Sequence, residues 1–560
     1  MNHHYWNLLP LVPEHHVVKT AGYSALITQL LYNRGFTTPS LIDSFMSANE
    51  PLLGDPLLLP DIQRATSRIY RALLSGENIA VYGDFDVDGI TSTALMVKGL
   101  SSLGGNVIPY IPNRLTEGYG LKTAALENLC RQGISLVITV DCGTTAIPQI
   151  EKAQKTGLDI IVTDHHTTLE ELPPAIAVIN PKWHDSAYPF RELAGVGVAF
   201  KLMQAVLQGV GKAEEINSFT DLVALGTIAD LVPLVGENRY LVKQGLDMIN
   251  THPRLGIREI MVRNNLDKGK VDSGSISWVI APRLNAAGRI SHAMTSYQLL
   301  TTESPEEASD LTITLEEKNK SRQRMTTRVL SKAREQILSR GITPLLIASD
   351  RDYPQGIIGL AAGRICEEFY RPTIIIKAGE KTSSGSCRSI PEFNITQALE
   401  KCQHLLTYFG GHAQAAGFTL PTENLTQLEE ELNSLATSEL KEIDLKPQVN
   451  IDAEVKLSDL NQDMFKAINH LAPFGRGNPL PNFISRGVDV INYRTIGSAG
   501  SHLVMKFRQE NSVWDGVGFR MGDNATEITS HMDILYNIEV DNWNGADRLR
   551  LNLLDFHPLV

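Results

Sequence analysis

The sequence has few cysteines, no long apolar run and no excess of basic residues, and each lack argues against a class of protein. Its five cysteines are an odd number without C-x-x-C spacing, so neither a disulfide framework nor a structural zinc site is indicated. No 18-residue apolar run or signal-peptide pattern occurs, so we expect a cytoplasmic protein without a membrane segment. Because the net charge is −12, a nucleic-acid site would have to be a local groove of Lys and Arg.

The length and composition indicate a multidomain globular protein. Hydrophobic residues make up 42% of the chain and charged residues 20%, which is ordinary for a protein with a packed core. A chain of 560 residues is too long for one core, so we expect three or four domains.

The densest acidic signal is the stretch 81–90, VYGDFDVDGI. It continues a β-branched and aromatic run at 78–82, which predicts a buried strand. We expect Asp84, Asp86 and Asp88 to lie on an extended chain, where alternate side chains face the same way and converge. The residues that follow, GITST, then allow a sharp turn and a cap for the next helix.

Carboxylates this close together repel one another, and a divalent cation removes that cost. A solvated acidic turn and an Asp-rich calcium loop are simpler alternatives for the same stretch. The EF-hand form of the calcium loop is excluded, because no Glu follows at the required position.

Beyond this stretch, strand and helix patterns alternate. Strands are predicted at 106–108, 136–140 and 159–163, with helices near 122–131 and 147–156. Such alternation indicates an α/β fold with a mostly parallel sheet and helices on both faces.

Polar residues recur where these strands end. Asp141 follows one strand, Asp164-His165-His166 follows the next, and Asp230 is the single carboxylate of the apolar segment 222–234. Taken one at a time they could be helix caps, surface histidines or a buried acceptor. Together they are better explained by one crevice at the carboxyl ends of the strands, where open α/β sheets bind their ligands.

The residue types at this crevice suggest phosphoryl chemistry. Mixed carboxylate and imidazole ligands suit Mn²⁺ or Mg²⁺ better than a thiolate-seeking metal. Two such ions bridged by a carboxylate suit in-line phosphoryl displacement. Hydrolysis of a phosphoester or phosphoanhydride is therefore the predicted reaction.

These motifs, in this order, resemble those of the DHH phosphoesterase superfamily. They are GDFDVDG at 83–89, VDCG at 140–143, DHH at 164–166 and AD at 229–230. With IPNR at 111–114 and EGYG at 117–120, the chain is similar to the RecJ family of single-strand-specific exonucleases. The similarity continues through 194–201, 282–289, 385–389, 410–417 and 471–479. It departs at Tyr353-Pro354, where relatives usually have a tryptophan-histidine or similar pair, so Pro354 replaces a potential phosphate or base contact.

The resemblance implies two α/β lobes, the DHH and DHH-associated domains, joined by a long helix and followed by an OB-type β-barrel. Helix formers from 305 to 338 and five short strands after about 450 agree with this order. The implied division is a helical N-terminal preface at 1–75 packed on the first domain, a DHH domain at 76–303, a connecting helix at 304–340, a DHH-associated domain at 341–445 and an OB domain at 446–560.

The resemblance also implies residue roles. The catalytic set is Asp84, Asp86, Asp88, Asp141, His165, His166 and Asp230. Within it, the ligands of two Mn²⁺ or Mg²⁺ ions are Asp86, Asp88, Asp141, His165 and Asp230, with Asp84 and His166 nearby as supporting or substrate-contacting groups. DNA contacts are Arg114, Arg283, Asn285, Arg289, Ser386, Arg388, Gly410, Gly411 and His412. Without the resemblance, Gly410-Gly411 would predict a plain turn.

The implied function is a 5′-to-3′ exonuclease that degrades single-stranded DNA to 5′-mononucleotides in repair and recombination. Single-stranded DNA is the implied partner of a monomer, and a single-strand-binding protein or a helicase is a candidate protein partner. One alternative is a small-substrate DHH phosphoesterase, whose relatives lack the barrel. Another is a non-cutting replication scaffold, which is disfavoured because every motif carboxylate is present.

Overall fold

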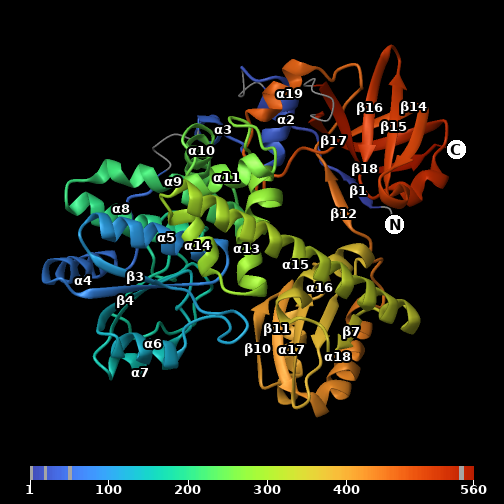
Figure 1. Ribbon diagram of the computed structural model, residues 1–560. Coiled ribbons are helices and arrows are strands. Elements are labelled where there is room, and N and C mark those ends of the chain that lie inside the picture. The colour runs from blue at the N-terminus through green and yellow to red at the C-terminus, as the bar shows by residue number, and fades with distance from the viewer. Residues whose placement is uncertain (1–3, 18–21, 48–52, 542–547, 560) are drawn as a thin grey trace. The chain divides into compact units, whose positions relative to one another are not determined.

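The computed structural model describes residues 4–17, 22–47, 53–541 and 548–559, which form two compact units (Figure 1). The parallel-sheet unit comprises Ser44–Gln323 and Pro473–Pro479. The barrel-containing unit comprises Met1–Asp43, Arg324–Ala472 and Leu480–Val560. No helix in the described ranges is long and apolar enough to cross a membrane.

The parallel-sheet unit is built on five parallel strands in the order β3-β2-β4-β5-β6. The central strands β2, β4 and β5 are mostly apolar and buried, as expected for a sheet covered on both faces, whereas the edge strand β3 is partly exposed. The prediction of a parallel sheet is confirmed, and one further strand, β6, closes its edge. The strands are β2 Asn78–Gly83, β3 Asn106–Tyr110, β4 Ile134–Val140, β5 Asp159–Thr163 and β6 Ala177–Ile179.

Helices cover both faces of this sheet (Figure 1). One face packs in the larger core against α4 Ile62–Ser75, α5 Val87–Ser102 and α8 Gly195–Gly209, and the other against α6 Thr123–Arg131 and α7 Ile147–Gln154. The remaining helices of the unit are α9 Thr220–Ala229, α10 Gly236–Thr251, α11 Leu255–Arg263, α12 Ser273–Ser275, α13 Ala281–Ile290 and α14 Met294–Thr301, with 3-10 turns at Pro56–Leu58 and Ala213–Phe219 and a π-helical turn at Ile276–Ile280.

The acidic stretch is not the extended chain that we predicted. β2 ends at Gly83 and α5 already begins at Val87, because an Asp86 oxygen accepts hydrogen bonds from the backbone N–H groups of Asp88 (3.1 Å) and Gly89 (3.2 Å). Asp86 is therefore the N-cap. The residues predicted to cap the helix, 91–93, lie inside it, where their hydroxyls donate to carbonyls one turn earlier.

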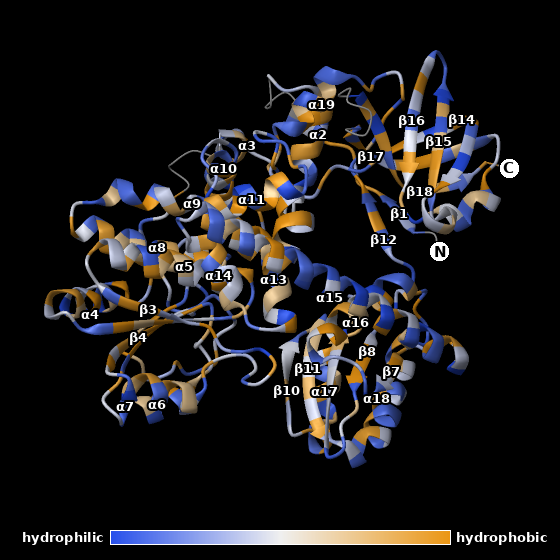
Figure 2. Ribbon diagram, in the orientation of Figure 1, coloured by the Kyte–Doolittle hydropathy of each residue, from blue (hydrophilic) through white to orange (hydrophobic). Residues whose placement is uncertain are grey.

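A single helix, α15 Pro305–Arg340, continues from the parallel-sheet unit into the barrel-containing unit, as predicted. The Ser304 hydroxyl accepts from the Glu307 N–H at its start (3.2 Å). The helix is largely hydrophilic, and most of its length is blue in Figure 2. On this helix, Glu316 accepts hydrogen bonds from Arg283 and Asn264.

The barrel-containing unit holds a five-stranded sheet in the order β10-β11-β9-β8-β7, with only β7 and β8 parallel. Gly410 and Gly411 lie in strand β10, so the plain turn favoured for them is wrong. The strands are β7 Leu346–Asp350, β8 Thr373–Lys377, β9 Thr382–Arg388, β10 Tyr408–His412 and β11 Ala415–Pro421, and the helices are α16 Gln355–Phe369, α17 Ile395–Lys401 and α18 Leu425–Leu440.

The predicted C-terminal barrel is confirmed. Its strands follow the order β13-β14-β15-β16-β18-β17, and β14 pairs with β17 to close it. Of its aromatic residues, Phe507 is buried in the core, whereas Tyr493 and Phe519 are about half exposed. The strands are β13 Ala453–Glu454, β14 Phe483–Ile496, β15 His502–Gln509, β16 Ser512–Gly518, β17 His531–Asp541 and β18 Arg548–Pro558, and helix α19 spans Gln462–Asn469.

The predicted helical preface is divided between the two units. A strand near the N-terminus, β1 Tyr5–Leu8, pairs in parallel with β12 Gln448–Ile451. Arg34, at the end of α2 Ala25–Asn33, bonds to Asp452 (3.1 Å). Only the later part, including α4, packs on the first α/β core. Two short helices complete the preface, α1 Glu14–Val17 and α3 Pro39–Ser47, and residues 1–3, 18–21 and 48–52 lie outside the described ranges.

One buried ion pair inside the parallel-sheet unit generates a stability prediction. Lys201 Nζ of α8 lies 2.5 Å from Glu237 Oε1 of α10, and their side chains are 0% and 1% exposed. Lys201→Met leaves a buried carboxylate without its cation and should cost about 3–5 kcal/mol. The exposed pair Lys212–Glu215 supplies the control, because Lys212→Met should cost less than about 1 kcal/mol. Equal decreases in melting temperature for the two variants would contradict the prediction.

Candidate metal centre

The predicted acidic and histidine residues meet at one edge of the parallel sheet. Asp84, Asp141 and the segment 164–166 follow the carboxyl ends of β2, β4 and β5. Asp88 lies in the first turn of α5, and Asp230 is the C-cap of α9. Asp230 therefore ends a helix rather than a strand, but it reaches the same crevice.

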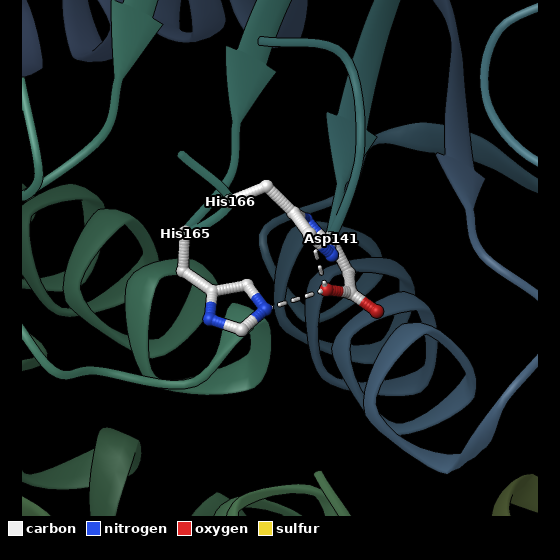
Figure 3. Close-up of side chains that lie close together, drawn as sticks. All are labelled: Asp141, His165 and His166. Carbon is white, nitrogen blue, oxygen red and sulfur yellow. Dashed lines mark ion pairs between the residues drawn. The ribbon is translucent and has the colours of Figure 1, made fainter. Parts of the chain in front are cut away.

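Asp141 and two histidines form the centre of this crevice. His165 Nε2 lies 3.2 Å from Asp141 Oδ1, and His166 Nδ1 lies 4.0 Å from the same oxygen. Figure 3 shows both imidazole rings turned toward that carboxylate. His165 Nε2 is also 3.6 Å from Asp230 Oδ2 and 3.8 Å from Asp88 Oδ2.

Three groups of side chains are close enough to share an ion. In each group, one ligand atom per residue lies within 4.8 Å of the others. The groups are Asp84–Asp86–Asp141, Asp88–His165–Asp230 and Asp141–His165–His166. Asp141 and His165 each belong to two of them, so they are the residues best placed to join neighbouring ions.

Backbone N–H groups hold two carboxylates of the crevice, Asp88 and Asp164, in place. Asp88 accepts from the N–H groups of Gly195 (2.7 Å) and Val196 (2.8 Å) at the start of α8. Asp164 accepts from the N–H groups of His165 (2.7 Å), His166 (3.1 Å) and Thr144 (2.9 Å). Because the N-terminus of a helix favours negative charge, Asp88 stays in place without a cationic side chain.

The backbone at Asp141 is unusual. Its φ of +61° lies in the left-handed region, which side chains other than glycine rarely adopt. A Cβ atom at Gly195 would lie 2.6 Å from Asp141 Oδ1, so only glycine fits beside this carboxylate. The strained residue is the one at the centre of the crevice, as is common at functional sites.

The carboxylates resist ionisation in the absence of a cation. Burial, followed by the charge of Asp86, raises the pKa of Asp84 to about 8 and that of Asp230 to about 7. Burial and the neighbouring carboxylates raise the pKa of Asp88 and of Asp141 well above the ordinary value. A bound cation would reverse this, because it favours the charged form of each group.

The two histidines differ in charge. Burial, reinforced by the charge on His166, lowers the pKa of His165 to about 3, so its ring is neutral at physiological pH. Burial also opposes charge on His166, but the 2.7 Å bond from its Nδ1 to Asp164 outweighs burial and raises its pKa to about 9. A neutral His165 does not form an ion pair with Asp141, and its Nε2 lies 3.2 Å from the carboxylate, within reach of a shared cation.

The donor atoms fit a divalent metal. Asp84 Oδ1, Asp141 Oδ1 and His165 Nε2 are buried without a hydrogen-bond partner. Buried polar atoms normally have a partner, so these atoms point to a group that they would bind. Carboxylate oxygens with one or two imidazoles suit Mn²⁺ or Mg²⁺.

The residues predicted to contact DNA divide between the two units. Arg114 is in the parallel-sheet unit with its guanidinium carbon 4.0 Å above the ring of Phe85, and its charge acts on Asp84 and Asp86. Arg283 bonds through all three guanidinium nitrogens to Glu316, Asn264 and the Val279 carbonyl, so these contacts give its predicted phosphate role no support. Asn285 and Arg289 are half-buried on α13.

The other predicted contacts lie in the barrel-containing unit. Ser386 and Arg388 project from β9 toward α16, where a Cβ atom at Gly359 would meet both. Arg388 Nη1 lies 3.4 Å from Ser386 Oγ. Gly410 pairs with Gly417, which in turn pairs with Ser386, so these three residues are neighbours across three strands. Gly411 and His412, the remaining predicted contacts, are exposed at the end of β10.

The departure at Tyr353-Pro354 is structural in this chain. Tyr353 is 2% exposed and belongs to the core between α15 and α16, and Pro354 is the N-cap of α16.

Three residues near the centre have no role in the sequence-based prediction. The Tyr119 hydroxyl lies 3.4 Å from His166 Nε2. The charges of Lys182 and Arg476 act on Asp230. Tyr119 and Arg476 lie within the motifs 117–120 and 471–479, where the family resemblance could have drawn attention to them, whereas Lys182 follows β6, a strand that we did not predict.

Three family descriptions match successive parts of the chain. The DHH family N-terminal domain matches residues 78–227, the DHHA1 domain 343–438 and the RecJ OB domain 451–555. Single-stranded-DNA-specific exonuclease RecJ of Dickeya dadantii is 32% identical over 559 residues, covering 96% of this chain and 96% of that protein. The chain belongs to the RecJ family.

Other RecJ proteins agree with this assignment. RecJ of Bacillus subtilis is 36% identical over 535 residues, which cover 95% of this chain and 67% of that protein. The crystal structure of RecJ from Thermus thermophilus in complex with Mn²⁺ has a TM-score of 0.86 and 27% identity, and the match covers 99% of this chain and 80% of that chain. The corresponding Mg²⁺ complex has a TM-score of 0.80, 26% identity and coverage of 99% and 79%. The prediction that Mn²⁺ or Mg²⁺ is the metal is thus confirmed for the RecJ family.

The raised pKa values generate a prediction about pH and metal. An aspartate in an unfolded chain has a pKa of about 3.9, whereas that of Asp230 is about 7 and that of Asp84 about 8. The metal-free folded state therefore binds more protons than the unfolded state between about pH 4 and pH 8, and its stability falls as the pH rises. Because Mn²⁺ binds the ionised carboxylates, it should raise the melting temperature more at pH 8 than at pH 6. A shift of equal size at both pH values would contradict this.

Proposed function

We propose that this chain is a metal-dependent exonuclease that degrades single-stranded DNA from the 5′ end and releases 5′-mononucleotides. The observation that carries the proposal is the convergence of Asp84, Asp88, Asp141, His165 and Asp230 at one sheet edge with unsatisfied buried donor atoms. The RecJ relatives are named single-stranded-DNA-specific exonucleases. DNA repair and recombination are the processes in which such an activity serves.

We propose that two ions are held by the groups described above. Asp84, Asp86 and Asp141 face one position, and Asp88, His165 and Asp230 face the other. Asp84 thereby becomes a direct ligand, which differs from the supporting role expected from the sequence, because its Oδ1 is buried without a partner. When bound, Mn²⁺ or Mg²⁺ lowers the pKa of water and offsets charge on phosphoryl oxygens.

Other side chains bind and orient the substrate. Arg114, stacked on Phe85 beside Asp84 and Asp86, is placed to hold a phosphoryl oxygen of the scissile group. His166 donates its Nδ1 hydrogen to Asp164, which keeps its imidazolium group charged beside the crevice. That group can donate to a phosphoryl oxygen or to the departing 3′ oxygen.

We propose that the barrel-containing unit selects the single strand and its 5′ end. Ser386, Arg388, Gly410, Gly411 and His412 would hold the terminal phosphate, and exposed Tyr493, Arg494 and Phe519 of the barrel would stack on bases and follow the backbone. The division at 1–75, 76–303, 304–340, 341–445 and 446–560 belongs to this proposal. We also propose that the protein is a cytoplasmic monomer, and that its protein partner is a single-strand-binding protein or a helicase.

A polarity assay tests the reaction. Single strands labelled at either end, and matched duplexes, are incubated with the purified chain and Mn²⁺. We expect the 5′ label to appear in mononucleotides from the first time points, the 3′ label to stay in shortening strands, and duplexes to resist. Release that begins at the 3′ end, or equal rates on duplex, would reject the proposal.

Asp141→Asn tests the centre of the metal site. Asparagine tolerates the left-handed backbone and keeps the size of the side chain, but it removes one of the repelling charges. We expect cleavage to fall by more than about 100-fold, in excess of the 10–100-fold typical for groups that only support ligands. The melting temperature of the metal-free protein should stay the same or rise. Near-normal cleavage, or a loss of cleavage that tracks unfolding, would remove Asp141 from the proposed centre.

A further inference from the structure

A hairpin from the C-terminal half of the chain packs within the parallel-sheet unit. Residues 473–479, PFGRGNP, belong to this unit although the chain before and after them does not. The backbone N–H of Leu234 donates to the Arg476 carbonyl (2.7 Å), and the Ser273 hydroxyl donates to that of Phe474 (2.6 Å). Leu234 lies four residues after Asp230, so the hairpin is held against the segment that leaves the metal centre.

The position of the hairpin tip is tightly specified. Gly475 and Asn478 exchange backbone hydrogen bonds of 2.8 and 3.1 Å, and the buried Asn478 side chain donates to the Pro473 carbonyl (2.9 Å). A Cβ atom at Gly475 would lie 2.7 Å from Leu234 Cδ1. Gly477 has a φ of +76°, and a Cβ atom there would lie 3.0 Å from Pro233. This turn holds residue 476 at a fixed place beside the centre.

The side chain at that place is a cation that the protein does not neutralise. Arg476 is exposed, and within the described part of the chain its guanidinium has no ion pair or side-chain hydrogen bond. It is nevertheless near enough for its charge to act on Asp230, as the charges of His166 and Lys182 do. An arginine held only to compensate Asp230 would be expected to bond to it directly, because such pairs are strong and often bidentate.

We propose that Arg476 is a substrate-binding residue that holds a phosphate of the single strand next to the one being hydrolysed. The inference rests on the proposed nuclease function and adds a residue to it. A guanidinium matches two phosphate oxygens with parallel N–H donors, and a rigid turn keeps that geometry ready before the strand arrives. The hairpin therefore adds a positive side chain near Asp230, on a side of the crevice that is rich in carboxylates.

The test compares Arg476→Ala and Arg476→Lys with Arg131→Ala. Arg131 is exposed in the last turn of α6, just before the start of β4. Asp141 follows the other end of β4, so the two residues lie at opposite ends of that strand. Initial rates on a 5′-phosphorylated single strand give kcat and KM. Equilibrium binding between about 50 and 200 mM salt is measured in an Asp141→Asn background, so that the strand is not consumed. Mn²⁺ affinity is measured on each Arg476 variant without DNA.

We expect Arg476→Ala to raise KM about 5- to 10-fold, with a smaller change in kcat. The plot of log affinity against log salt should become less steep, by about 0.7 in the magnitude of its slope. Arg476→Lys should keep most of the slope and recover part of KM, and Arg131→Ala should match the unchanged chain. Mn²⁺ affinity should stay the same or increase, because a cation beside Asp230 is lost. An unchanged KM and slope, or a defect that follows weaker Mn²⁺ binding, would overturn the inference.

The two proposals fail separately. If the unchanged chain does not degrade single strands with Mn²⁺, the proposed function fails whatever Arg476 does. If it degrades them and Arg476→Ala does so with the same KM and salt slope, only the role of Arg476 is rejected.

Discussion

Repulsion among buried carboxylates is the constraint around which the parallel-sheet unit is arranged. Asp84, Asp88, Asp141 and Asp230 meet at one edge of the sheet, and burial and mutual charge raise the pKa of each. Flexible side chains would relieve such repulsion by turning into solvent. Here the backbone prevents it, through the α8 amides at Asp88 and the left-handed conformation of Asp141. Either a proton or a bound cation lowers the energy of the arrangement, so the geometry that opposes ionisation of these carboxylates also favours binding of a divalent ion.

Much of this arrangement could be predicted from the sequence, because it follows from local rules. Strands at 136–140 and 159–163 are mostly apolar, and polar residues at the carboxyl ends of parallel strands must share an edge. The acidic stretch was less certain, since Asp at alternate positions is compatible both with an extended chain and with a helix N-cap. In the structure Asp86 is a helix N-cap, because its side-chain oxygen accepts hydrogen bonds from the N–H groups of Asp88 and Gly89.

What could not be predicted depends on partners far away in the sequence. The partners of Arg283, Glu316 and Asn264, could not be read from the sequence, and its predicted DNA contact stays a prediction. The four-residue strand β1 has no periodic signal of its own and exists because β12, more than 400 residues later, offers an edge. Arg476 lies within the predicted OB domain at 446–560, but the hydrogen bond from the Leu234 N–H to its carbonyl holds it in the parallel-sheet unit.

The exchange of segments between the two units sets an order for folding during synthesis. The parallel-sheet unit has all of its strands once residue 179 has emerged, but it lacks the hairpin until residue 479 has been made. The strand β1 is made first and must wait for β12 before its edge is paired. Contacts of such long sequence separation form late, because the chain between them must first be ordered. The acidic and histidine residues of the crevice are thus all made by residue 230, whereas Arg476 follows more than 200 residues later.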